Sequence, residues 1–305
     1  MRRRLRSPLS MIVGCTCLLA AACVPADEAL PLGSAEFTIT GRGSPRTLLA
    51  ADALVGQWSI HVDRFLLSFR TMTIVNLEIA DQCAYRGRGA VTNIVFDGAV
   101  GSVVQAFNGI MPGDCPDVGM RLGSPDDHTV PGDGATVDDI LGMLTGRPSH
   151  ALFEATATHE AGPAFGKART VKLSLRFDTA RTSSAFGGCR DAIRGARIRP
   201  EGRDAKFVAV AAEAFFRDAL SSGAELRFQP FLTADGEGNA DGVVTMDELD
   251  ALPLDSSGSF YLLPNGNHAG SFGDYVRAQF MFAVKYGDGG LCNGIAPGTE
   301  DIVSP

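Results

Sequence analysis

The 305-residue sequence lacks the short motifs that identify several large enzyme families. It contains no G-x-S-x-G nucleophile elbow, no Walker A motif, and no G-x-G-x-x-G run between a strand and a helix. His159-Glu160 begins like a zinc-protease helix, but Ala161-Gly162-Pro163 follows and no second histidine stands at the required spacing. Because no nucleophile–base pair is recognisable, the sequence favours a binding or structural module over an enzyme.

Basic residues are scarce relative to acidic ones. The chain has 27 Lys and Arg against 35 Asp and Glu, for a formal net charge of −8. The amino-terminal segment described below holds four of the arginines and no acid, so its removal lowers the charge to −12. Phosphate-backbone binding requires clustered Lys and Arg, and we therefore expect no nucleic-acid partner.

The amino terminus has the layout of a secretory signal. Met1–Arg6 is positively charged, and Leu9–Ala22 is apolar but too short for a membrane-spanning helix. The run Leu19-Ala-Ala-Ala-Cys23 resembles a bacterial lipobox, which implies that Cys23 is the lipidated first residue of the mature chain. Cys15 is a competing cysteine, and cleavage after Ala22 without lipid is the alternative. The absence of Asp directly after the cysteine favours the outer membrane as the site of the anchor.

The remaining chain is predicted to form one domain. Residues 1–22 would be the signal, residues 23–33 a tether, and residues 34–305 a single β-rich domain. The 36 glycines and the turn-bounded runs of β-branched residues predict an antiparallel β-sandwich with a few short helices. We find neither a repeat of about 20–50 residues nor a low-complexity block.

The clearest strand pattern occurs in Ala151–His159 and Arg169–Phe177, where apolar and polar residues alternate on both sides of a Gly/Pro turn. Trp58–Phe69 and Met72–Ile79 are predicted to form a hairpin. Gly113–Gly119 is predicted to be a turn. Further strand candidates are Glu36–Thr40, Ala90–Phe96, Lys206–Phe216 (whose alanines also permit helix) and Ser259–Leu263. Helices are expected at Thr136–Leu144 and Phe272–Tyr286.

Four cysteines remain once the signal and the lipidated residue are set aside. An even number in an exported protein implies disulfides, and four cysteines allow three connectivities. We favour Cys83–Cys115 and Cys189–Cys292, the first closing a loop in the amino-terminal half and the second fastening the carboxy-terminal end. No C-x-x-C occurs in the mature chain, which argues against a zinc ribbon.

The most specific chemistry lies in Asp235–Leu249, with the sequence D-G-E-G-N-A-D-G-V-V-T-M-D-E-L. A calcium loop places oxygen ligands at positions 1, 3, 5, 7, 9 and 12 and glycine at position 6. With Gly242 at position 6, the predicted ligands are Glu237, Asn239, Asp241, the Val243 carbonyl, Thr245 and Glu248. Since position 1 ordinarily holds Asp, Asp235 is an open alternative to Glu237 there.

A short helix is predicted after this loop, because Thr245 is an N-cap residue and Glu248 completes a capping box. The preceding segment, Gly223–Phe231, contains Pro230 and is predicted to be a strand or irregular chain. The pattern resembles a single dockerin-like EF-hand loop with its exiting helix, which implies calcium as the cofactor. An acidic surface turn capping a short helix is the alternative. The lipobox and the loop together resemble uncharacterised exported bacterial lipoproteins.

The sequence-based hypothesis is therefore a lipid-anchored cell-envelope protein with a structural calcium site. The membrane is its expected partner through the lipid anchor, and a protein or glycan partner is undefined. Two other hypotheses stay open: an exported enzyme, for example a hydrolase, with structural calcium, and a transition-metal binder. The second would require His61, His150 and His159, which lie on neighbouring predicted strands, to meet.

Overall fold

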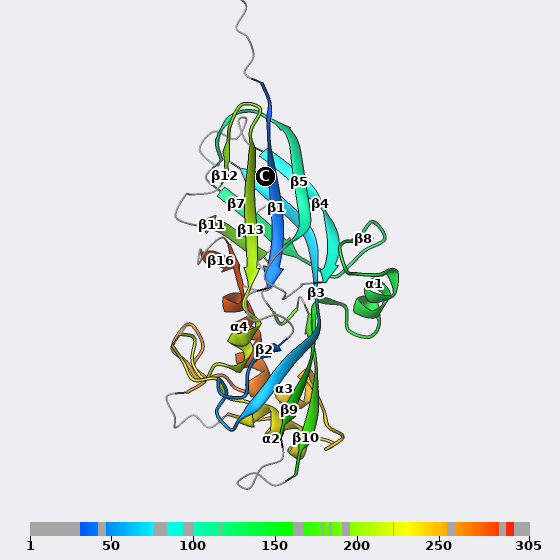
Figure 1. Cartoon of the computed structure of the whole chain (residues 1–305), viewed down its shortest axis with the longest axis vertical. Helices are drawn as coiled ribbons and strands as arrows, with labels where there is room; N and C mark the ends of the chain where they lie inside the picture. Colours follow the sequence, from blue (N-terminus) through cyan, green and yellow to red (C-terminus); the bar gives the residue numbers. More distant parts are fainter. Residues whose placement is uncertain are drawn as a thin grey trace, which may run out of the picture.

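The computed structural model describes residues 31–41, 47–75, 84–93, 101–115, 117–160, 167–178, 180–182, 185–190, 196–221, 223–254, 260–286 and 291–295. The protein is mainly β with a few short helices, as predicted, and its sheets stack in a sandwich-like arrangement (Figure 1). None of the described helices is both long and apolar enough to cross a membrane. The predicted signal and the lipidation candidate Cys23 lie outside the described residues.

Strands form one large sheet, one smaller sheet and a two-stranded ribbon. The ten-stranded sheet runs β14 (Val243–Thr245), β10 (Arg169–Asp178), β9 (Ser149–His159), β3 (Trp58–Val75), β7 (Asp117–Leu122), β11 (Ala185–Arg190), β16 (Leu291–Ile295), with β2 (Thr47–Leu49) and β4 (Ala84–Asn93) on β3 and β8 (Val130–Pro131) on β4. The four-stranded sheet runs β15 (Val284–Tyr286), β13 (Arg203–Val210), β1 (Gly33–Gly41), β5 (Ser102–Ile110). The ribbon pairs β12 (Ala196–Ile198) with β6 (Gly113–Cys115).

Most strand pairs among the described residues are antiparallel, and three of them are parallel: β1 with β13, β10 with β14, and β4 with β8. The predicted β9–β10 pair is confirmed, with Leu173 opposite Ala155 and Leu175 opposite Phe153. Alternate residues of β10 are buried, including Leu173, Leu175 and Phe177, while those between them are more exposed. The period-two pattern therefore identifies the face of β10 that meets the core.

Two local predictions are wrong. The predicted Trp58–Ile79 hairpin is instead continuous strand over its described part, β3, which pairs with β9 along its first half and with β7 along its second. The register with β7 shifts between Phe69 and Thr71, so the strand bends there without turning back. Of the predicted Gly113–Gly119 turn, the described residues are strand, in β6 and at the start of β7, and Pro116 lies outside the described residues.

The helices agree with their capping signals. α1 (Val137–Leu144) begins after Thr136, which forms a capping box with Asp139. α4 (Phe272–Ala283) covers most of the predicted Phe272–Tyr286 helix. The last three residues of that range form the strand β15 instead. Lys206–Phe216, for which strand and helix were both open, is strand in its first part and helix in its second. β13 ends at Val210, and a 3₁₀ helix, η1 (Ala212–Phe216), follows. Of the predicted Ser259–Leu263 strand only a bridge from Leu262 to His268 is described.

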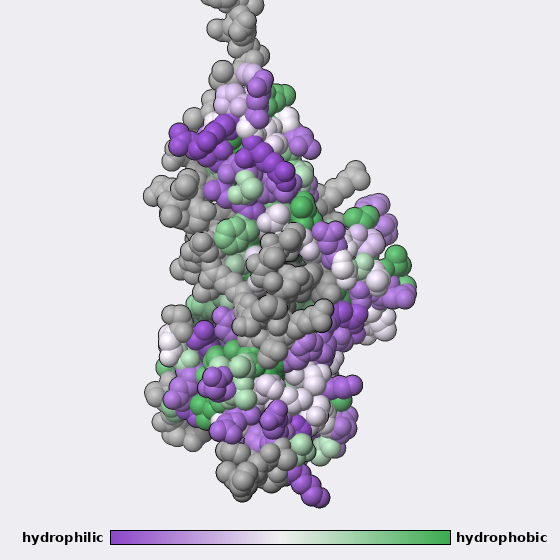
Figure 2. All heavy atoms as spheres, in the orientation of Figure 1, coloured by the Kyte–Doolittle hydropathy of each residue, from purple (hydrophilic) through white to green (hydrophobic). Residues whose placement is uncertain are grey.

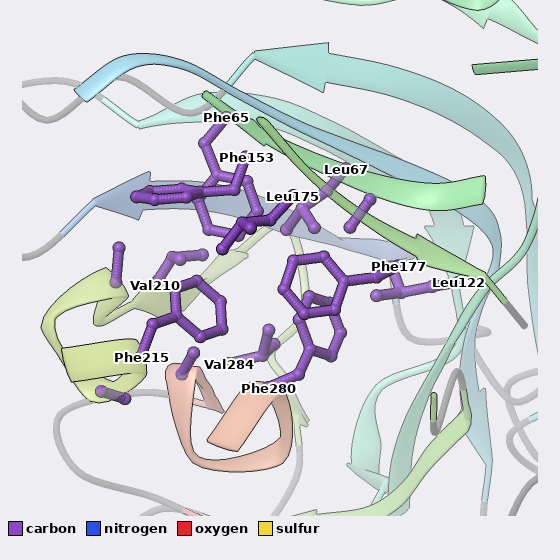
Figure 3. Close-up of a cluster of buried hydrophobic side chains, with 14 of the residues drawn as sticks. Phe65, Leu67, Leu122, Phe153, Leu175, Phe177, Val210, Phe215, Phe280 and Val284 are labelled. Atoms are coloured by element: carbon purple, nitrogen blue, oxygen red, sulfur yellow. The ribbon is translucent and has the colours of Figure 1, made fainter. Parts of the chain in front are cut away.

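The larger cluster of buried hydrophobic residues contains side chains from both larger sheets and from η1 and α4. Figure 3 shows Phe215 of η1 and Phe280 of α4 facing Phe153 and Phe177 of the large sheet. The Phe177 ring lies 5.3 Å from that of Phe215 and 4.9 Å from that of Phe280. Each buried phenylalanine contributes roughly 1.5–3 kcal/mol, and each ring pair about 0.5–1.5 kcal/mol more.

The face shown in Figure 2 is polar, with scattered hydrophobic residues. On β8 and α1, Val130, Val137 and Leu141 are each more than half exposed. The opposite face of α1 packs Ile140 and Met143 against the large sheet. α1 is therefore fixed to the sheet by one apolar face while a second faces solvent.

His150 is a polar residue in an apolar environment. Its side chain is fully buried and packs edge-on against Phe280, with ring centroids 5.3 Å apart. Neither ring nitrogen has a hydrogen-bond partner among the described residues. Burial disfavours the charged imidazolium and lowers the pKa of His150 from 6.5 to about 3.

The folded protein should therefore lose stability on acidification through His150. The unfolded chain takes up this proton near pH 6.5 and the folded protein only near pH 3, so the free energy of unfolding falls by up to about 1.4 kcal/mol per pH unit in between. The His150→Leu variant should show a smaller pH dependence of unfolding, measured in urea between about pH 4 and 6.5. His128→Leu, at a side chain 84% exposed, is the control. An unchanged slope in His150→Leu would contradict the assignment.

Candidate calcium loop

A helix, a loop, a short strand and a second helix follow one another in the predicted calcium region. α2 (Gln229–Glu237) enters the loop, β14 follows it, and α3 (Met246–Ala251) leaves. The prediction of strand or irregular chain before the loop is therefore wrong from Gln229 onward. Pro230 does not break the helix, since it stands in the first turn, where its missing N–H would have no partner within the helix.

The turn of the loop has the backbone conformation that its glycine permits. Gly242, the predicted position 6, has φ of +80°, and Ala240 has φ of +55°. The Ala240 N–H donates to the Asp235 carbonyl at 2.8 Å, which closes the chain directly after α2. Left-handed φ is strained for alanine, so the surrounding hydrogen bonds must hold this turn in place.

Asp235 and Glu237, the two candidates for the first ligand, differ in orientation. The Asp235 side chain is buried, and its Oδ1 accepts the Gly242 N–H at 3.0 Å across the loop. Its Oδ2 lies 3.4 Å from Nη2 of Arg169 on β10. Glu237, the last residue of α2, is exposed. The carboxylate that faces the interior of the loop is thus that of Asp235.

Glu248 reaches back from α3 to both ends of the loop. Its Oε2 accepts from the Thr245 N–H at 2.8 Å and from the Thr245 hydroxyl at 3.0 Å, which confirms the predicted capping box. Its Oε1 lies 3.5 Å from the Asn239 N–H. A Cβ at Gly238 would stand 2.7 Å from this oxygen, so glycine is required for the approach. Glu248 therefore connects the exit of the loop with its entrance.

Asn239 and Asp241 complete the set of predicted side-chain ligands and are both exposed. The Asn239 Nδ2 donates to Asp241 Oδ2 at 3.1 Å, and Asp241 Oδ1 accepts the Val243 N–H at 2.8 Å. Among the described residues, no three His, Cys, Asp or Glu side chains are grouped closely enough to hold a metal. The donor set suits Ca²⁺, but the carboxylates of this loop are directed at backbone amides.

The loop is attached to the rest of the protein on two sides. β14 pairs in parallel with Lys172–Ser174 of β10. On the other side, Arg277 of α4 donates to Asp250 of α3 through both terminal nitrogens, and Arg181 donates to the same carboxylate at 2.6 Å. The sequence reading missed this pair. The feature of the sequence that could have indicated it is Arg277, a charged residue on a helix face that is otherwise apolar and buried.

The pKa of Asp250 reflects two opposing effects. Burial raises it, but hydrogen bonds from Arg277 and Arg181 outweigh burial and hold the pKa below its ordinary value. The ion pair therefore stabilises the fold at neutral pH, and this stabilisation is lost as the pH falls through the lowered pKa. Arg277 is only 4% exposed, so removing its partner would leave a buried charge.

Asp250→Asn should accordingly reduce the free energy of unfolding by about 3–5 kcal/mol at neutral pH, the usual cost of breaking a buried pair from one side. Urea unfolding measures the loss. Asp247→Asn, on the same helix at a side chain 75% exposed, should change it by less than about 1 kcal/mol. Similar losses in both variants would show that Asp250 acts as a surface charge.

The proposed histidine site for a transition metal does not form. His150 and His159 both belong to β9, nine residues apart, which corresponds to about 30 Å along a strand. His61 lies on β3 opposite Thr156 and is exposed. Because ligand nitrogens lie near 2 Å from the metal, these three side chains cannot share one ion.

Of the four cysteines in the disulfide prediction, the side chains of Cys115 and Cys189 are described. Both are disulfide-bonded and fully buried. Cys83 and the side chain of Cys292 lie outside the described residues, so the pairing Cys83–Cys115 and Cys189–Cys292 stays a prediction.

Comparison with known proteins adds little to these assignments. Neither a protein-family model nor a curated protein matches the sequence. Among solved structures, MbnP from Methylosinus trichosporium is similar at 14% identity, covering 78% of this chain and 93% of that chain, with a TM-score of 0.33. A likeness at this level supports no inference about function, which must be argued from the loop itself.

Proposed function

We propose that this protein is exported, lipid-anchored in the cell envelope through Cys23, and stabilised by one calcium ion bound in the loop 235–248. It would act as a binding or structural module and face its environment from the outer membrane, where the envelope has one. The observation that carries the calcium proposal is the Asp235 carboxylate, buried at the end of α2 and hydrogen-bonded to Gly242 across the turn. The lipid anchor rests on the lipobox-like sequence alone.

In this proposal, Asp235 takes the first ligand position in place of Glu237. Asn239 and Asp241 would supply side-chain oxygens, Val243 its carbonyl, Thr245 its hydroxyl, and Glu248 a bidentate carboxylate. Asp241 and Glu248 would exchange their present hydrogen bonds to backbone amides for the metal. The left-handed turn at Gly242 and the helix on each side of the loop support this proposal.

Calcium would offset the repulsion between carboxylates held in one short loop. Asp235, Glu237, Asp241, Asp247 and Glu248 lie within fourteen residues, and Arg169 is the cation paired with Asp235. A bound ion would connect the end of α2 to the start of α3 and thereby support the β14–β10 pairing. Extracellular modules of this kind bind with a Kd of about 10⁻⁴ to 10⁻³ M, which suits a structural rather than a sensory role.

Thermal unfolding of the mature domain tests the calcium proposal. Calcium at about 100 times its Kd should stabilise the protein by about 2.7 kcal/mol relative to chelator, and Glu248→Gln should abolish that difference. Glutamine preserves the capping box, so α3 stays capped while the anionic ligand is lost. Asp247→Asn, at the neighbouring exposed carboxylate, should respond to calcium like the wild type. Identical curves with calcium and chelator would establish the loop as an acidic turn.

Membrane fractionation of the full-length protein tests the anchor separately. Cys23→Ala should release the exported protein from the membrane fraction and abolish incorporation of a labelled fatty acid, because the acceptor thiol is absent. Cys15→Ala, at the competing cysteine, should leave both unchanged. A soluble, unlabelled wild-type protein would support cleavage after Ala22 without lipid.

A further inference from the structure

A cavity of about 320 Å³ lies beside the exit of the candidate calcium loop. Its walls come from the segment directly after α1, the second half of β10, the end of β14 with the start of α3, and α4. The lining residues include three arginines, namely Arg147, Arg176 and Arg277, together with Ser174 and Thr245. Such a concentration is notable in a protein whose net charge is −8.

The three arginines differ in how their charge is balanced. Arg277 is paired with Asp250, and Arg147 with the exposed Asp247 at 2.9 Å. Arg176 faces neutral partners: its Nη1 donates to the carbonyls of Gly142 at 2.9 Å and Thr145 at 3.2 Å. Within the described part of the chain, no carboxylate lies within ion-pair distance of Arg176. Its charge is therefore available to a ligand.

Unused donors on Arg176 also point to a ligand. Arg176 uses one of its three nitrogens in the contacts above. The Nε of Arg277 has no hydrogen-bond partner among the described residues either, but this nitrogen is enclosed by protein atoms. The donors left for a ligand are therefore those of Arg176 and Arg147.

We propose that this cavity binds a small oxyanion, the carboxylate or phosphate group of an organic molecule, between Arg176 and Arg147. Guanidinium groups bind such oxygens through paired, charge-assisted hydrogen bonds, and Ser174, which also lines the cavity, would add a neutral one. Asp178 and Asp247 also line the cavity and limit it to one anionic group beside a neutral or cationic part. The site rests on its arginines and not on calcium, so it stands apart from the proposed function.

Calorimetric titration tests the site with the mature protein, at constant ionic strength and without added calcium. The probes are inorganic phosphate, acetate and, as a neutral comparison, acetamide. We expect saturable binding of phosphate or acetate at millimolar or lower concentration and none of acetamide. Phosphate binding alone would identify a phosphate-bearing ligand, and acetate binding alone a carboxylate. No saturable binding of either anion up to about 20 mM would overturn the proposal.

Variants locate the binding. Arg147→Gln and Arg176→Gln should each weaken the affinity about tenfold or more, since each removes a charge-assisted contact. Arg197→Gln is the matched control, because this exposed arginine lies on β12 in another sheet. Arg176 also donates to a carbonyl at the end of α1, so Arg176→Gln could disturb folding. Among the described residues Arg147 pairs only with the exposed Asp247, so Arg147→Gln tests the site even where Arg176→Gln fails to fold. Affinity within twofold of wild type in either folded variant would contradict the assignment.

Discussion

The packing of η1 and α4 onto the large sheet is the interaction on which the rest of the structure depends. Phe215 and Phe280 meet Phe153 and Phe177 in one buried aromatic cluster. This cluster fixes α4, and α4 in turn holds α3 through Arg277 and Asp250. α3 is the exit helix of the candidate calcium loop and one wall of the arginine-lined cavity. Both candidate sites are thus positioned by a hydrophobic cluster that includes none of the residues of either site.

The loop and the cavity share one short element, β14. Thr245 contributes to the loop through its bonds with Glu248 and also lines the cavity. Its neighbour Ser174 on β10 lines the same cavity and pairs with it in the sheet. A change in the conformation of β14 would therefore be felt at both sites, since packed elements shift as units rather than deform continuously.

Sequence reasoning worked where a local rule decides the conformation. Alternation identified β9 and β10, and the capping residues Thr136 and Thr245 located the starts of α1 and α3. It failed where tertiary partners decide. β3 continues as one strand because different neighbours pair with its two halves, and α2 forms although Pro230 read as a helix breaker. The residue types alone predicted the loop and its exit helix, whereas the burial of the Asp235 side chain and the Arg277–Asp250 pair required coordinates.

β14 has one more consequence, because it is the terminal strand of the large sheet. It covers only Lys172–Ser174 of β10, and it does so as part of a loop rather than as a long strand. A short edge that twists away into a helix offers few unpaired backbone groups to another molecule. Without it, β10 would present a ten-residue edge whose inner face is apolar. While the loop stays folded, β14 therefore interrupts this edge at Lys172–Ser174 and leaves no continuous run of ten unpaired backbone positions to which a second copy could add a strand.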